Sequence, residues 1–138
     1  MSWMKTVLPL AALSLAACAS APGPASQGDT LPPGRWAGEQ IALEISPSGG
    51  GHIELSCASA EFLGPVKVDV GGHFLTEGRF ARGTGVATQD GPAWVPANIS
   101  GRVDPGGVLW LDIALRDSYP VRSARLEHGA EANLLRCL

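Results

Sequence analysis

Residues 41–57 read IALEISPSGGGHIELSC, and this stretch decides the fold. Apolar and polar residues alternate through residues 41–45, three glycines follow at 49–51, and the alternation resumes through residues 52–57. A period of two is typical of a β-strand with one buried face, and a glycine-rich connection between two such runs is typical of a hairpin. The stretch therefore predicts two antiparallel strands, with Cys57 on the inward face of the second.

The same alternation recurs along the rest of the chain. Further runs cover residues 66–70, 74–80, 97–103, 109–115, 121–127 and 134–138, with glycine-rich turns at 71–72 and 104–107. No window shows a sustained helical period with capping residues. Seven or eight short strands in about a hundred residues predict an all-β fold, a single small antiparallel barrel or barrel-like sandwich with a lipocalin-like meander.

The start of the chain carries a targeting pattern. A weakly basic segment, Met1–Lys5, precedes a mostly apolar run, 6–17, that is too short to span a bilayer as a helix. The run ends in Leu15-Ala16-Ala17-Cys18, which resembles the lipobox of bacterial lipoproteins at each position. The resemblance implies cleavage after Ala17 and acyl chains on Cys18, which would hold the protein at a membrane. An ordinary signal peptide cut near the same place is the alternative.

The segment after the cysteine predicts a linker and a location. Residue 19 is alanine rather than an acidic residue, which by the same resemblance implies a lipid-anchored envelope protein at the outer membrane, facing the periplasm. Residues 18–34 are rich in proline, glycine and alanine and show no periodicity, so we expect a flexible linker there. The predicted organisation is a signal peptide at 1–17, the lipidated cysteine and linker at 18–34, and an all-β domain at 35–138.

Charge excludes one class of partner. The chain has 10 basic and 13 acidic residues, and loss of Lys5 with the signal peptide leaves nine basic residues and a net charge of −4. These charges are scattered, whereas nucleic-acid binding needs clustered lysine and arginine. We therefore expect no nucleic-acid partner.

Two cysteines remain once Cys18 is assigned to lipid. In an oxidising compartment Cys57 and Cys137 are expected to form a disulfide. Such a bond closes a loop of roughly 80 residues, worth about 4–5 kcal/mol in loop-closure entropy. Free thiols or a metal site are the alternatives, and zinc has little support because neither cysteine has a second one nearby.

The domain also resembles a family of small bacterial exported proteins to which we can assign no activity. The shared motifs are the G-x-W start, the I-x-L-x-C-A strand, a G-x-F hairpin, a G-R-V segment and a terminal Cys-Leu, here at residues 34–36, 53–58, 72–74, 101–103 and 137–138. The chain departs from the family at Ala37, where glycine is more common. The resemblance implies the fold and the disulfide only. The G-x-W start is also similar to that of lipocalins and of small barrel-shaped protease inhibitors from bacterial envelopes.

Candidate chemistry is sparse. His52 and Glu54 share one strand face and His73 and Glu77 share another, so the four would make a zinc or copper site if their strands met. The predicted strand 66–70 lies between them, which favours solvated polar faces, and we predict no metal and no cofactor.

One serine-containing segment superficially resembles a catalytic motif. Ser46-Pro47-Ser48 lacks the first glycine of a nucleophile elbow and the helix that must follow it, so it reads as a hairpin turn. No catalytic residue is predicted, and we expect a protein that is not an enzyme.

Three tryptophans stand out in the domain. Trp36 starts the first strand and is expected in the core. Trp110 falls on the polar face of its strand, and Trp94 lies in the longest irregular stretch, 82–96. Either Trp94 and Trp110 form an exposed partner-binding patch, or the irregular stretch folds over the sheet and covers Trp110.

The sequence therefore predicts a lipid-anchored, non-enzymatic binding or structural module, such as an inhibitor or accessory of another envelope protein. Its expected partners are the membrane, through acyl chains on Cys18, and an envelope protein. A lipocalin-like carrier of a small apolar ligand and an enzyme with an unrecognised site are the alternatives.

Overall fold

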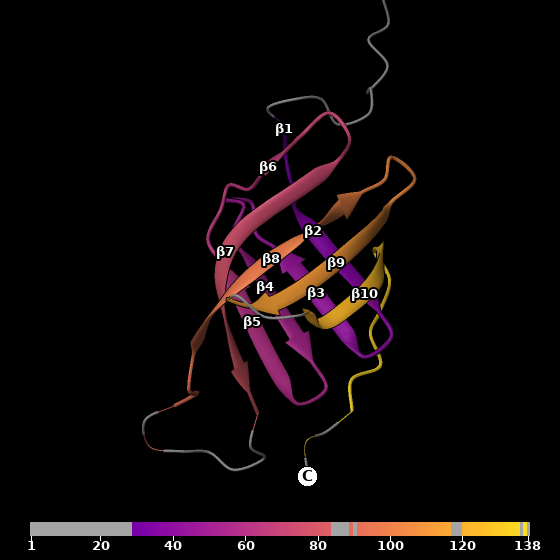
Figure 1. Cartoon of the computed structure of the whole chain (residues 1–138). Coiled ribbons are helices and arrows are strands. Elements are labelled where there is room, and N and C mark those ends of the chain that lie inside the picture. The colour runs from indigo at the N-terminus through magenta and orange to yellow at the C-terminus, as the bar shows by residue number, and fades with distance from the viewer. Residues whose placement is uncertain (1–28, 84–88, 90, 117–119, 136, 138) are drawn as a thin grey trace, which may run out of the picture.

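The computed structural model describes residues 29–83, 89, 91–116, 120–135 and 137, and these residues form an all-β domain (Figure 1). The strands are β1 (Asp29–Thr30), β2 (Gly34–Gly38), β3 (Ile41–Ile45), β4 (Gly51–Leu55), β5 (Ala58–Phe62), β6 (Lys67–Val68), β7 (His73–Arg82), β8 (Val95–Val103), β9 (Val108–Leu115) and β10 (Pro120–His128). Eight of them close an antiparallel barrel in the order β10-β2-β3-β4-β5-β7-β8-β9, and β1 pairs with β6 outside it. The predicted single small barrel is confirmed.

The connections divide the barrel into two ends. One end, which we call the tether end because the described chain enters the domain there at residue 29, holds the β3–β4 hairpin, the small β1–β6 sheet, the turn at 69–72 and the β8–β9 hairpin at 104–107 (Figure 1). At the far end lie the β2–β3 and β4–β5 hairpins and the C-terminal tail. Neighbouring strands of the barrel follow one another along the chain, with β6 between β5 and β7, as expected for a meander. The exception is the pair of β10 and β2, which closes the barrel.

The barrel interior is filled by the inward side chains of the alternating runs. The fully buried large ones in the barrel are Ile41, Leu43, Ile53, Ile99, Leu109, Leu111, Ile113 and Leu126. Trp36 is 2% exposed and packs edge-on against His128 at the tether end, with ring centroids 4.7 Å apart, so its predicted core position is confirmed. An interior of eight strands is just wide enough for such side chains to fill.

The ladder between β10 and β2, which closes the barrel, is short. Only Glu127 and His128 of β10 pair with β2 in register, opposite Ala37 and Trp36. Toward the far end, Nη2 of Arg122 donates a hydrogen bond of 2.7 Å to the carbonyl oxygen of Glu39 in the β2–β3 hairpin. The arginine therefore continues the β10–β2 connection where the ladder has ended.

The two domain cysteines come together at the far end. Cys57 and Cys137 lie at disulfide distance, with their Cα atoms 5.0 Å apart and a sequence separation of 80. The predicted position of Cys57 on the inward face of a strand is wrong, because Cys57 lies in the β4–β5 hairpin, is exposed, and has a φ of 133°. The tail is also held by a hydrogen bond of 2.8 Å from the amide of Leu135 to the hydroxyl of Ser56. The pair thus fastens the tail to a hairpin rather than one strand to another.

The folded domain begins before residue 35. Asp29 and Thr30 pair with Val68 and Lys67, and Leu31 is 1% exposed within the core, with its amide donating to the carbonyl of Val66 at 2.9 Å. The predicted linker 18–34 is therefore too long at its C-terminal end. A single leucine among prolines has no periodicity to reveal it, yet its side chain belongs to the hydrophobic core.

Two predicted strands are shorter or missing. The run at 66–70 gives only the two residues of β6, and these lie in the small sheet with β1 rather than in the barrel. The described residues of the run at 134–138 form no strand. The run at 121–127 lies within β10 as predicted. The signal peptide 1–17 and Cys18 lie outside the residues that the structure describes.

Candidate functional site

A row of polar side chains crosses the outer surface of four neighbouring strands. Glu44 on β3 lies opposite His52 on β4, His52 opposite Glu61 on β5, and Glu61 opposite Arg79 on β7. Their neighbours in sequence, such as Leu43 and Ile53, face the core. Because side chains alternate across a sheet, all four polar residues face outward on one line.

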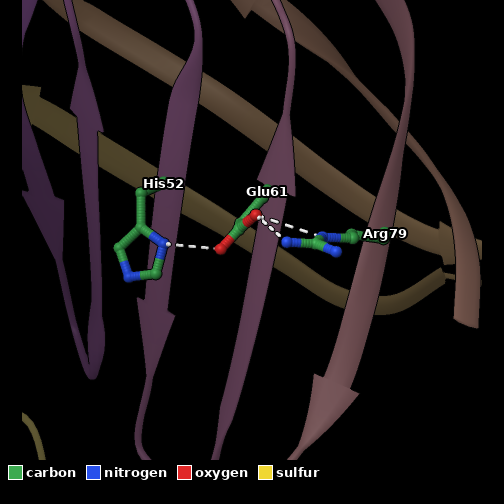
Figure 2. A network of polar contacts seen from close by, with 3 residues as sticks. All are labelled: His52, Glu61 and Arg79. Carbon is green, nitrogen blue, oxygen red and sulfur yellow. Dashed lines mark hydrogen bonds and ion pairs between the residues drawn. The ribbon is translucent and has the colours of Figure 1, made fainter. Parts of the chain in front are cut away.

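Glu61 is the centre of this row (Figure 2). Its Oε2 accepts hydrogen bonds from Arg79, at 2.7 Å from Nη2 and 3.1 Å from Nε. Its Oε1 lies 3.7 Å from Nδ1 of His52. The three side chains are between a third and just over half exposed, so the network sits at the surface, where such pairs fix geometry more than they add stability.

Trp94 extends the network from a different part of the chain. The guanidinium carbon of Arg79 lies 4.2 Å from the centroid of the Trp94 ring. A guanidinium over an indole face is held electrostatically as well as by packing. Arg79 is thereby fixed from two sides, by the Glu61 carboxylate and by the Trp94 ring.

A groove of about 680 Å³ opens beside the polar row. The residues that line it are Glu44, Ser46, Gly50, Gly51, His52, Glu61, Phe62, Leu63, Glu77, Gly78, Arg79 and Arg116. The register explains the shape. One wall is the polar row, the other is formed by the next outward positions, including Ser46, Leu63 and Glu77, and the intervening backbone at Gly51, Phe62 and Gly78 makes the floor.

Glycine is required at one floor position. A Cβ on Gly51 would overlap the ring of Phe62, which packs inward from the facing position on β5. The phenylalanine ring therefore fills the space that a side chain on β4 would take. No side chain of Gly51 or Phe62 projects into the groove, because glycine has none and the Phe62 ring points into the barrel.

The groove is lined by three carboxylates, Glu44, Glu61 and Glu77, and by two arginines, Arg79 and Arg116, and it has an apolar rim. Glu61 is balanced by Arg79, whereas Glu44 and Glu77 make no ion pair within the described part of the chain. Leu63 is 89% exposed at the edge of the groove. Carboxylates without a partner beside an exposed leucine form a surface that fits a basic and partly apolar segment of another molecule.

The two predicted binding tryptophans do not form one patch. Trp94 precedes β8 at the far end, whereas Trp110 lies opposite Arg102, near the other end of the same strand. Eight residues of extended strand separate the two levels, roughly 25 Å. The two tryptophans therefore lie apart, and Trp110 is 43% exposed. Residues 84–88 and 90 of the irregular stretch lie outside the described residues, and partner binding by Trp94 or Trp110 stays a prediction.

The two histidine strands with candidate metal ligands also stay apart. His52 faces Glu61 rather than a second imidazole, and His73 begins β7, where its register partner is Arg102. The strand between the two histidine strands is β5, not the predicted strand 66–70. Among the described residues, no group of three or more potential ligands is placed to hold a metal ion. Ser46 belongs to the β3–β4 turn as predicted, with its hydroxyl 2.8 Å from that of Ser48.

Comparisons with known proteins give no further guide. The chain matches no family model, no curated protein and no solved structure. Among the described residues, no helix has the length and hydropathy needed to cross a membrane.

The groove itself was not predicted from the sequence. Glu61 and Arg79 are 18 residues apart, and only the β5–β7 register makes them neighbours. The signal available was that Glu44, His52 and Arg79 stand at outward positions of alternating runs, whereas Glu61 lies in β5, a strand that the sequence analysis did not predict. Without the register, this signal does not distinguish a continuous row from scattered surface charges.

Proposed function

We propose that this protein is a lipid-anchored, non-enzymatic envelope protein that binds another envelope protein through the groove between β3 and β7. The observation that carries the proposal is the combination of Glu44 and Glu77, two carboxylates that make no ion pair among the described residues, with the exposed side chain of Leu63. The partner would present a lysine or arginine beside an apolar side chain. An inhibitor or an accessory subunit would both use such a surface.

The anchor rests on the Leu15-Ala16-Ala17-Cys18 motif. Two or three acyl chains are enough to keep a small domain at a membrane. Ala19 favours the outer membrane, facing the periplasm, and the disulfide distance between Cys57 and Cys137 suits the oxidising conditions of that compartment.

The filled interior favours binding on the outside over carriage of an apolar ligand. A carrier needs an empty interior with an open mouth, whereas the inward positions here hold buried side chains such as Leu43, Ile99 and Ile113. Leu31 and Trp36 are also buried in this core, at 1% and 2% exposure. The groove, in contrast, is open to solvent and lies across four strands of a rigid sheet.

The test is capture of the partner at the groove itself. A photoreactive residue replaces His52, whose side chain lines the groove and is about half exposed. Irradiation of intact cells that express the full-length protein should give a discrete cross-linked product, identified by mass spectrometry. Binding of the purified partner is then measured with purified variants.

The groove variant combines Leu63→Ser, Glu44→Gln and Glu77→Gln. Its matched control combines Leu135→Ser, Glu54→Gln and Glu131→Gln, which makes the same chemical changes at exposed positions outside the groove. We expect at least about tenfold weaker binding for the groove variant, since a few central residues carry most of an interface's energy. Equal weakening by both variants, or by neither, would count against the proposal.

A further inference from the structure

We propose that the tether end of the barrel docks on the lipid head groups of the membrane that holds Cys18, through the side chains of Val70, Leu75 and Trp110. The inference rests on the lipid anchor in the proposed function and adds which face of the domain meets the bilayer. It uses a surface distinct from the groove residues Glu44 and Glu77.

These three side chains are unusually exposed for their type. Val70 and Leu75 are each 71% exposed, and Trp110 is 43% exposed. Val70 lies in the turn at 69–72 that leads into β7. Such side chains lose contact with water when they enter the head-group region.

The three belong to one side of the tether end. Leu75 is on the outer face of β7, opposite Ser100 of β8. Trp110 is on the outer face of β9, opposite Arg102, the next outward residue of β8. Val70 lies just before His73, which pairs with the same arginine from the other side. The apolar side chains therefore flank β8 at the end where the chain enters the domain.

The linker leaves the domain beside this surface. Asp29 is opposite Val68 in the small sheet, only two residues before Val70. Ten residues lie between Cys18 and Asp29, and a random-coil chain of that length would span about 17 Å root-mean-square. This distance is similar to the size of the domain, whose radius of gyration is about 13 Å for 110 residues. The tether end is thus the part of the domain held nearest to the lipid.

Charges on this surface are mostly balanced. Arg102 pairs with Asp104 at 2.8 Å, and Arg125 pairs with Glu127 at 2.7 Å. Arg125 also lies 5.9 Å from the Trp110 ring. Indole and guanidinium groups together suit the head-group level, but the paired carboxylates leave little net attraction to anionic lipid. We therefore expect apolar contacts to drive docking, with little dependence on salt.

Three side chains are too few to hold a free domain on a bilayer. The linker changes this, because a short tether raises the effective concentration of the surface at the membrane to the millimolar range. Weak contacts are then enough to fix an orientation. The same reasoning explains why the surface need not be large.

The experiment uses the two partly exposed tryptophans as reporters of opposite ends. The chain from residue 18 onward, which contains the whole described fold, is coupled through Cys18 to a maleimide lipid. It is placed in vesicles of phosphatidylethanolamine and phosphatidylglycerol that carry brominated acyl chains. Trp94→Phe protein reports on Trp110, Trp110→Phe protein reports on Trp94, and the buried Trp36 contributes equally to both.

We expect brominated lipid to quench Trp110 and to leave Trp94 unchanged, at low and at high salt. In the Trp94→Phe protein, Val70→Ser with Leu75→Ser should remove most of the quenching. The matched control, Val121→Ser with Leu135→Ser, changes exposed residues of the same types at the far end and should have no effect.

Two results would overturn the inference: no quenching of Trp110, as expected if a protein or a second copy of the chain covers this face, or equal quenching of both tryptophans, as expected for free tumbling. Chemical coupling at Cys18 keeps this test separate from the anchor. Native acylation is read independently, from the intact mass of protein purified from bacterial membranes.

Discussion

Leu31→Ala is the sharpest test of where the domain begins. Leu31 lies in the proline-rich segment before β2, yet its side chain is 1% exposed and belongs to the hydrophobic core. Truncation of a buried leucine removes its transfer free energy and leaves a cavity, which together cost about 2–5 kcal/mol. The hydrogen bond from its amide to Val66 is a backbone contact and is retained. We expect a loss near the middle of that range, about 3 kcal/mol.

The assay is urea unfolding of the domain, followed by calorimetry. For a domain of this size, about 3 kcal/mol corresponds to a fall in Tm of roughly 12 °C. The control is Leu63→Ala, the same substitution at a leucine that is 89% exposed, which should change the free energy of unfolding by no more than about 0.5 kcal/mol. If the two variants unfold alike, Leu31 is not part of the core and the folded domain begins later.

Three further outcomes are expected. Cys137→Ser should lower the free energy of unfolding by roughly 4–5 kcal/mol, the loop-closure value for a separation of 80, and non-reducing peptide mapping of the unmodified protein should recover Cys57 joined to Cys137. The changes in the free energy of unfolding caused by Trp94→Ala and Trp110→Ala should add to within about 0.5 kcal/mol in the double variant, because distant sites are independent. A larger coupling energy would place the two side chains in contact. Gly51→Ala should cost about 1–3 kcal/mol by overpacking against Phe62, and a smaller side chain at residue 62 should recover part of that loss in the double variant.

The fold was predictable because alternation is a local property. Residues 41–45 and 51–55 carry their hydrophobic pattern within a few positions, and the glycines between them mark the turn. The same pattern does not show where an isolated side chain packs. Leu31 has polar or proline neighbours, and Cys57 continues the alternation of β4 although the chain has already turned.

The site was less predictable because it depends on register between strands. Glu61 and Arg79 meet only through the β5–β7 ladder, and Trp94 reaches Arg79 only through the path of the segment before β8. The separation of Trp94 from Trp110 has the same origin, because outward positions at opposite ends of neighbouring strands look alike in a sequence. The type of each residue thus indicated that its side chain lies at the surface. Which surface side chains contact one another depends on the order and register of the strands.

The placement of groove and linker makes the two proposals compatible. Ser46 and Leu63, at one end of the groove, follow strands that run toward the tether end, whereas Arg116 follows β9 at the far end. A domain resting on Val70, Leu75 and Trp110 would therefore keep part of its groove away from the lipid. A partner could then approach from the aqueous side while the acyl chains remain inserted. Loss of the groove residues should therefore leave a protein that is folded and anchored but without its partner, whereas loss of the docking surface should change only the orientation of the domain on the lipid.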